Sequence, residues 1–83
     1  MSHVDQQLFE ALRSWRSHTA KAEAVPPYVI FNDRTLVEIA QARPTSHAGL
    51  EPISGFSKAK FARYGDAVLE IVRNSSEKRN APP

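Results

Sequence analysis

The stretch best suited to contact an anion is GFSKAKFARYG, residues 55–65. Gly55 permits a turn that approaches a partner closely, and Ser57 is a favoured residue for capping the start of a helix. A helix N-terminus favours an anion, and either Lys58 or Lys60 would add a full positive charge beside it. The alternative is that Gly55 only forms a tight turn between helices and that the lysines belong to a hydrated helix surface.

The wider string ISGFSKAK has the pattern hydrophobic–x–Gly–hydrophobic–x–x–x–Lys. It resembles the hairpin and second-helix start of a helix-hairpin-helix element, with Ser57 where a second glycine would strengthen the likeness. A second candidate is Tyr28 in VPPYVIF, residues 25–31. An aromatic ring on a proline-stiffened connector can stack on an unpaired base. It can equally pack into the core with its hydroxyl in water.

Residues for catalysis are not grouped in this sequence. The three histidines, His3, His18 and His47, are scattered, and no HExxH pair, Walker A loop or GxSxG elbow is present. The chain has no cysteine, which excludes disulfides and thiolate metal sites and fits a reducing compartment. We therefore predict a non-catalytic domain with no catalytic residues, no metal and no cofactor.

The 83 residues carry a net charge of +2, and the charge is unevenly spread. Residues 1–33 contain three cations and four carboxylates, whereas residues 34–83 contain eight cations and five carboxylates. A phosphate-binding surface is therefore expected in the second part. No apolar run approaches the ~18 residues that would indicate a membrane span, so no membrane association is expected.

Apolar residues at helical spacing predict an all-α fold, a compact bundle of about five helices. Pro26, Pro44 and Gly65 mark ends between them, Gly65 as a left-handed residue after a helix. The expected helices are 4–24, 33–43, a short one ending near residue 50, 58–64 and 67–72, with residues 25–31 an extended or single-turn connector. The expected domain comprises residues 7–73, between a flexible N-terminus (1–6) and a disordered tail (74–83).

Three strings, in this order along the chain, resemble the HRDC domain, the helicase-and-RNase-D C-terminal module. They are LFEALRSWR, VPPYVIFNDRTLVEIAQARP and ISGFSKAKFARYGDAVLEIV, which together cover about residues 7–72. The PPYVIFND form looks most like the version in bacterial RecQ-type DNA helicases, and UvrD-like helicases stay an alternative parent.

This resemblance implies a five-helix bundle attached to an ATP-dependent DNA helicase of the 3′–5′ RecQ type. It implies an accessory domain, a monomer, that binds single-stranded or junction DNA weakly and modulates substrate choice. The alternative is a protein-interaction module that docks on its own helicase core or on a partner. The implied location is the cytoplasm, at the bacterial nucleoid. The implied DNA-binding residues are Tyr28, with Lys21, Arg34 and Arg16 near it, and Lys58 and Lys60 as a second group.

Overall fold

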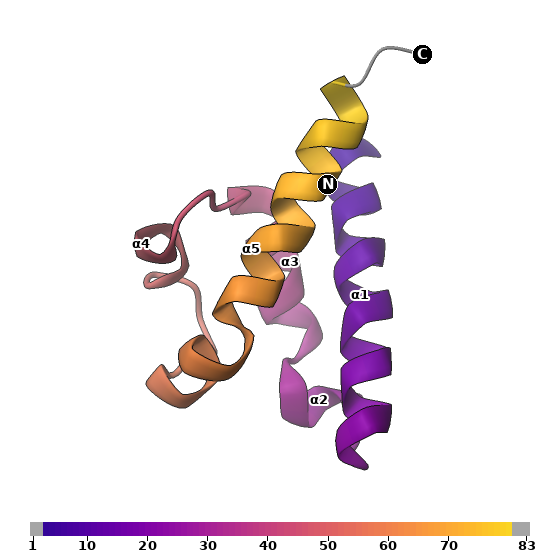
Figure 1. Ribbon diagram of the computed structural model, residues 1–83, viewed down its shortest axis with the longest axis vertical. Helices are drawn as coiled ribbons and strands as arrows, with labels where there is room; N and C mark the ends of the chain where they lie inside the picture. Colours follow the sequence, from indigo (N-terminus) through magenta and orange to yellow (C-terminus); the bar gives the residue numbers. More distant parts are fainter. Residues whose placement is uncertain (1–2, 81–83) are drawn as a thin grey trace.

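Five helices account for the regular structure of this chain. The computed structural model describes residues 3–80, with side chains over 5–75, and within that part there is no strand (Figure 1). The helices are α1 (His3–Glu23), α2 (Pro27–Ile30), α3 (Asp33–Ala42), α4 (His47–Leu50) and α5 (Lys58–Asn80). The predicted all-α bundle is confirmed. Over the described residues, no helix is long and apolar enough to cross a membrane.

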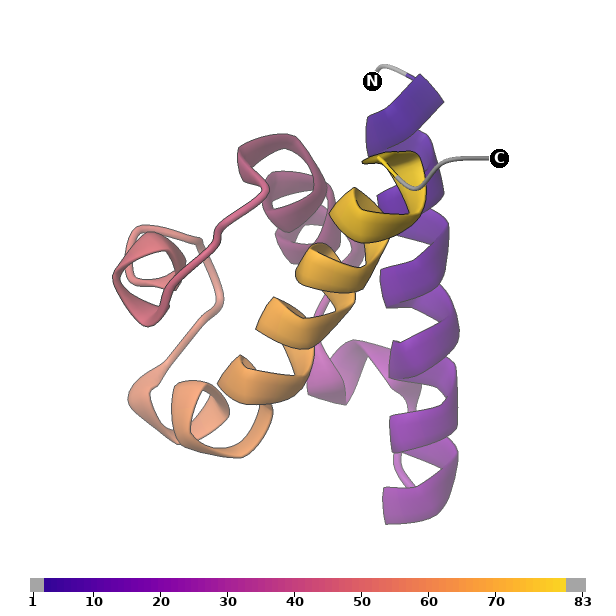
Figure 2. The same cartoon turned by 45° about the horizontal axis from the view of Figure 1, so that its top comes forward.

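The long helices α1 and α5 run antiparallel (Figures 1 and 2). Tyr64 near the start of α5 bonds to Glu23 at the end of α1. Arg43, just after α3, lies 3.9 Å from Asp5 near the start of α1 and 3.4 Å from Ser75 late in α5. The start of α1 and the later part of α5 therefore lie at one end of the bundle, and α2 lies at the other.

The core is built from one apolar face each of α1, α3 and α5. These faces interlock because their buried residues recur at helical spacing: Leu8 and Leu12 on α1, Leu36 and Ile39 on α3, Val68 and Val72 on α5, all nearly inaccessible. Burying each such side chain stabilises the fold by about 1.5–3 kcal/mol. Trp15 and Phe61 are only partly buried and pack against this core.

The turn that contains Gly55 is fastened to the start of α3. Asn32 caps α3, since its side chain accepts a hydrogen bond from the Thr35 amide at 2.8 Å. The buried Thr35 hydroxyl lies 2.8 Å from the carbonyl oxygen of Ser54, and the Ser54 amide donates to Glu38 at 2.8 Å. Gly55 has a φ of +85° and sits directly against Thr35. These contacts therefore fix the turn that precedes α5 against α3.

The predicted break at Gly65 is wrong, because α5 runs without interruption through it. Gly65 is buried against Leu50 and His47 of α4. Glycine inside a helix costs about 1 kcal/mol. Tyr64, Val68 and the later residues of the same apolar face continue to pack on the core, and this packing outweighs that cost. The residues expected as two short helices, 58–64 and 67–72, therefore form one long helix.

Both ends of the helical region also differ from the predicted limits. Helix α1 begins at His3, inside the segment 1–6 that was expected to be flexible, and α5 continues to Asn80, into the expected disordered tail. Residues 74–80 lack an apolar face, but extending an existing helix is favourable where nucleating one is not. Residues 1–2 and 81–83 lie outside the described part, and the predicted domain limits of 7 and 73 stay a prediction.

Two glycine substitutions test this description, because they should change the free energy of unfolding in opposite directions. A Cβ at position 55 would lie 2.5 Å from the Thr35 hydroxyl, at a φ that alanine adopts only with strain. Gly55→Ala should lower the free energy of unfolding by about 2 kcal/mol or more. A Cβ at position 65 would make ordinary contacts of 3.7–3.9 Å, so Gly65→Ala should raise it by about 0.5–1 kcal/mol. Denaturant unfolding measures both, and a Gly65→Ala protein less stable than wild type would contradict the continuous helix.

Candidate nucleic-acid interface

The single turn α2 presents Tyr28 to solvent. Pro27 is well suited to the first position of a helix because its missing N–H has no partner there in any case. Ile30 and Phe31 point into the core, whereas Tyr28 is 70 % exposed and Val29 44 % exposed. The connector is therefore a single helical turn, one of the two forms expected. The interpretation of Tyr28 as a core residue is wrong, and its ring is free to stack.

Arg16 does not belong to this surface, although it was expected to contact phosphate. The residue is 9 % exposed. Its Nη1 donates to the carbonyl oxygen of Phe31 at 3.0 Å and lies 2.8 Å from a carboxylate oxygen of Asp33. Because the guanidinium is turned inward and already engaged by two acceptors, we infer that Arg16 holds the α2–α3 junction against α1.

The other two cations expected near Tyr28 are exposed. Lys21 lies in the last turn of α1, in the part of the bundle that also holds α2. Arg34 lies in the first turn of α3, and its Nε is 3.6 Å from Glu38. An exposed pair of this kind is worth about 0–1 kcal/mol, so a phosphate can compete for Arg34. The structure thus leaves Lys21 and Arg34 available at the ends of two helices that flank α2.

The start of α5 carries the second group of predicted cations. Ser57 caps this helix, since its hydroxyl oxygen accepts from the Lys60 amide at 3.3 Å. Lys60 is partly buried and its Nζ lies over the Phe31 ring, 5.3 Å from the centroid. Lys58 is exposed and takes part in no hydrogen bond or ion pair within the described residues. Lys58 is therefore the freer of the two lysines.

A hydrogen-bonded group links the end of α1 to α5. The Tyr64 hydroxyl donates to a Glu23 carboxylate oxygen at 2.8 Å, and Arg63 lies 3.0 Å from the same carboxylate. Burial raises the pKa of Tyr64 above its usual 10.0, the bond to Glu23 raises it further, and the Arg63 charge opposes the shift. Arg63 is less exposed than Arg34 and its ion pair is shorter, 3.0 Å against 3.6 Å, which lowers its value as a phosphate contact relative to Arg34.

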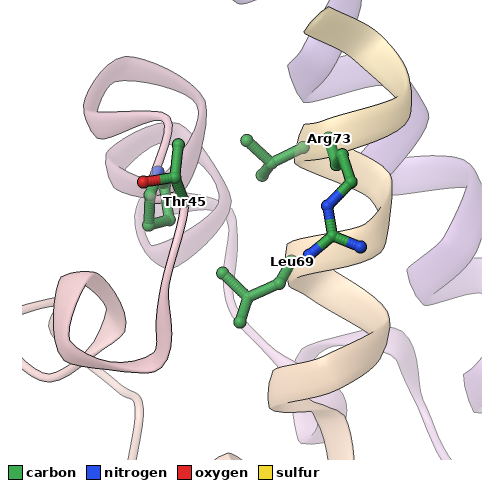
Figure 3. A pocket seen from close by; sticks show the side chains of 5 residues that line it. Thr45, Leu69 and Arg73 are labelled. Carbon is green, nitrogen blue, oxygen red and sulfur yellow. The ribbon is translucent and has the colours of Figure 1, made fainter. Parts of the chain in front are cut away.

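Two hollows lie beside α5. The aromatic hollow, of about 420 Å³, is lined by Glu51, Phe56, Lys58 and Phe61. The smaller hollow, of about 120 Å³, lies between the segment after α3 and the middle of α5, and is lined by Pro44, Thr45, Leu69, Val72 and Arg73. Figure 3 shows Thr45 and Leu69 on its opposite sides, with the Arg73 side chain along α5. Sequence reasoning found neither, because each joins segments whose contact only the folded chain defines.

A model of the HRDC domain family matches residues 5–72. The chain belongs to the HRDC domain family. The predicted resemblance is confirmed, and a solved structure, D. radiodurans RecQ HRDC domain 3, has the same fold. It aligns with a TM-score of 0.85 and 28 % identity over 92 % of this chain and 99 % of that one.

Two curated relatives of this HRDC domain carry helicase names. The ATP-dependent DNA helicase UvrD2 of Mycobacterium tuberculosis is 47 % identical over 70 residues, which are 84 % of this chain and 10 % of that protein. The ATP-dependent DNA helicase RecQ of Haemophilus influenzae is 37 % identical over 73 residues, 88 % of this chain and 12 % of that protein. The chain thus spans about a tenth of the length of these relatives.

No group of three potential metal ligands is gathered among the residues described.

Replacing Arg16 separates its structural role from DNA contact. Arg16→Met keeps an unbranched apolar stem but removes the guanidinium, which leaves the Phe31 carbonyl without its donor. We expect the free energy of unfolding to fall by about 1–3 kcal/mol, with the single-strand affinity of the folded fraction unchanged. Arg13→Met is the matched control, since Arg13 is exposed and, among the described residues, forms one ion pair, with Glu10 at 3.4 Å. It should change stability by less than about 0.5 kcal/mol. An Arg16→Met protein of normal stability with weakened DNA binding would contradict this assignment.

Because the pKa of Tyr64 is raised in the folded protein, the stability of the fold should change with pH in the alkaline range. A group whose pKa is higher in the folded than in the unfolded state contributes its full stabilisation below the unfolded value, and loses it as the pH rises. Stability should therefore decline above about pH 10. Chemical denaturation at about pH 8 and about pH 11 should show a larger loss for wild type than for Tyr64→Phe. The lysines titrate in both proteins, so an equal loss in the two would remove Tyr64 as the cause.

Proposed function

We propose that this HRDC domain is a non-catalytic accessory module of an ATP-dependent DNA helicase, which binds single-stranded or structured DNA weakly and modulates substrate choice. The observation that carries the proposal is the 70 % exposed ring of Tyr28 on a proline-led turn. An exposed aromatic ring can serve as a stacking platform for an unpaired base of any sequence, because every base has a π-face. Stacking on one unpaired base is worth roughly 1–3 kcal/mol.

The charges around Tyr28 support a weak interaction with phosphates. Lys21, Arg34 and Lys58 are exposed cations on helix ends, whereas Arg16 and Arg63 are held by Asp33 and Glu23. Few phosphate contacts give low affinity and a modest salt dependence. We therefore expect a dissociation constant of about micromolar or weaker at low salt. The expected partner is DNA in the bacterial nucleoid, bound by a monomer.

The parent enzyme is proposed to be a helicase of RecQ or UvrD type. The sequence favoured RecQ, while the identity to the UvrD2 relative, 47 %, exceeds the 37 % to the RecQ relative. Both names describe ATP-dependent DNA helicases, so the accessory role is the same in either case. The absence of catalytic motifs in the sequence supports a domain without ATPase or nuclease activity of its own.

A second candidate function is docking on the helicase core or on another protein. The smaller hollow favours it, because Pro44, Leu69 and Val72 line an apolar space with Arg73 beside it (Figure 3). Its volume of about 120 Å³ suits one aliphatic side chain of a partner. If no binding to a labelled single strand is detected at low salt, while the domain binds the isolated helicase core, docking becomes the better account.

Substitutions at Tyr28 test the DNA-binding proposal. Tyr28→Ala should weaken binding to a labelled single strand about tenfold, which corresponds to 1.4 kcal/mol, because the stacking surface is lost. Tyr28→Phe should bind normally, since stacking needs the ring alone. Fluorescence anisotropy at two salt concentrations measures the affinity, and thermal unfolding should show a nearly unchanged midpoint because the ring is exposed.

Val29→Ala is the matched control, since Val29 is the exposed neighbour of Tyr28 on the same turn but has no ring. Its affinity should match wild type. A folded Tyr28→Ala protein with unchanged affinity would remove Tyr28 from the DNA-binding surface.

A further inference from the structure

The aromatic hollow carries chemistry that the Tyr28 surface lacks. Its walls include Phe56 and Phe61, whose ring centroids are 6.3 Å apart in an edge-to-face arrangement. Phe56 is backed by Phe31 at 4.8 Å, and Phe61 by His47 at 5.2 Å. Both rings are therefore held in place before anything binds, so a flat ligand loses little to side-chain ordering. With a volume of about 420 Å³, the hollow has room for one nucleobase.

Two opposite charges face this hollow and do not neutralise each other. Glu51 and Lys58 both line it, and neither takes part in a hydrogen bond or ion pair within the described part of the chain. Lys58 is the first residue of α5, a long helix, so an anion there gains from the lysine and from the helix N-terminus. A ligand that complements both charges has an anionic group and, separate from it, hydrogen-bond donors.

A single nucleotide has this distribution of groups, and Glu51 decides which base suits it. A carboxylate only accepts hydrogen bonds. The Glu51 carboxylate repels phosphate. It can therefore favour DNA binding only by accepting hydrogen bonds from a base. Guanine offers two adjacent donors, N1–H and the N2 amino group, which can reach both oxygens of one carboxylate. Cytosine and adenine offer one amino group beside an acceptor nitrogen, and thymine flanks its single N–H with two carbonyl oxygens.

We propose that the aromatic hollow is a guanine-selective subsite for single-stranded DNA. Phe56 and Phe61 contact the base, Glu51 accepts from its N1–H and N2 amino group, and Lys58 binds the adjoining phosphate. The proposal rests on the proposed function, in that it names the sequence preference of the same DNA-binding domain. It uses residues separate from Tyr28, so the guanine preference can fail while the Tyr28-dependent binding of single strands remains.

The first experiment measures base preference by anisotropy. The probes are thymine oligonucleotides in which one central base is guanine, adenine, cytosine or thymine, which avoids the folding of guanine runs. Wild type should bind the guanine oligonucleotide about fivefold to tenfold more tightly than the thymine one, at the lower end of what a bidentate base contact provides. Equal affinity for all four would overturn the proposal while leaving the proposed function intact if Tyr28→Ala still weakens them all.

Variants then assign the preference to the hollow. Glu51→Gln should abolish the preference for guanine, and should slightly strengthen binding to the thymine oligonucleotide because a negative charge is lost. Glu70→Gln is the matched control, an exposed α5 carboxylate outside the hollow, and it should keep the preference. Lys58→Gln should weaken binding to all four oligonucleotides alike and reduce the salt slope by about one. A preference that survives Glu51→Gln would overturn the proposal.

A second experiment observes the site without a DNA strand. Amide chemical shifts of the isotope-labelled domain are followed while dGMP or dTMP is added. We expect dGMP to shift the amides between residues 51 and 61 at clearly lower concentration than dTMP, in wild type and in Tyr28→Ala alike. If dGMP binds there while no oligonucleotide binds, the hollow takes a nucleotide but not single-stranded DNA, which overturns the proposal together with the accessory DNA-binding role. Equal shifts with both nucleotides would show that Glu51 does not read the base, which overturns the proposal.

Discussion

The burial of Phe31 between α1, the Gly55 turn and α5 is the constraint on which the rest of the structure depends. The ring is 1 % exposed and contacts Trp15, Phe56 and Tyr64, with centroid distances of 6.1, 4.8 and 5.7 Å. Its backbone is extended, with φ −153° and ψ 147°, and so separates α2 from α3. Because Phe31 and Ile30 point inward, the short α2 has to turn Tyr28 and Val29 outward. The exposed ring is thus a consequence of the buried one.

Arg16 stabilises this arrangement and changes how the charge of the domain should be counted. A guanidinium removed from water needs partners, and the Phe31 carbonyl and Asp33 supply them, although its Nε has none within the described part. Arg63 is likewise engaged with Glu23, and Lys60 lies over Phe31. Part of the positive charge that the sequence shows therefore has partners within the protein. A domain of this kind can offer a polyanion only a few free cations.

The parts of the fold that depend on local signals could be predicted from the sequence. Proline residues marked the ends of the first helices, Ser57 caps the start of a helix as expected, and the ordered strings identified the family. Gly65 was misread because a glycine after a charged, aromatic stretch has the same local pattern whether a helix ends there or packs closely on a neighbour. The burial of Arg16 and the hollow beside Glu51 could not be predicted, since both arise from contacts between segments distant in the sequence.

With few free cations, affinity for DNA in the proposed role has to come from stacking and base contacts more than from phosphates. Such contacts discriminate between single strands and duplexes, because paired bases do not expose their faces. A weak module also suffices when it is tethered, since attachment to a motor raises its effective concentration at the bound strand to about millimolar for short linkers. Strong nonspecific charge would instead hold the motor on any duplex it met. The internal use of Arg16 and Arg63 is therefore consistent with a domain that selects structures in DNA and leaves the motor free to move.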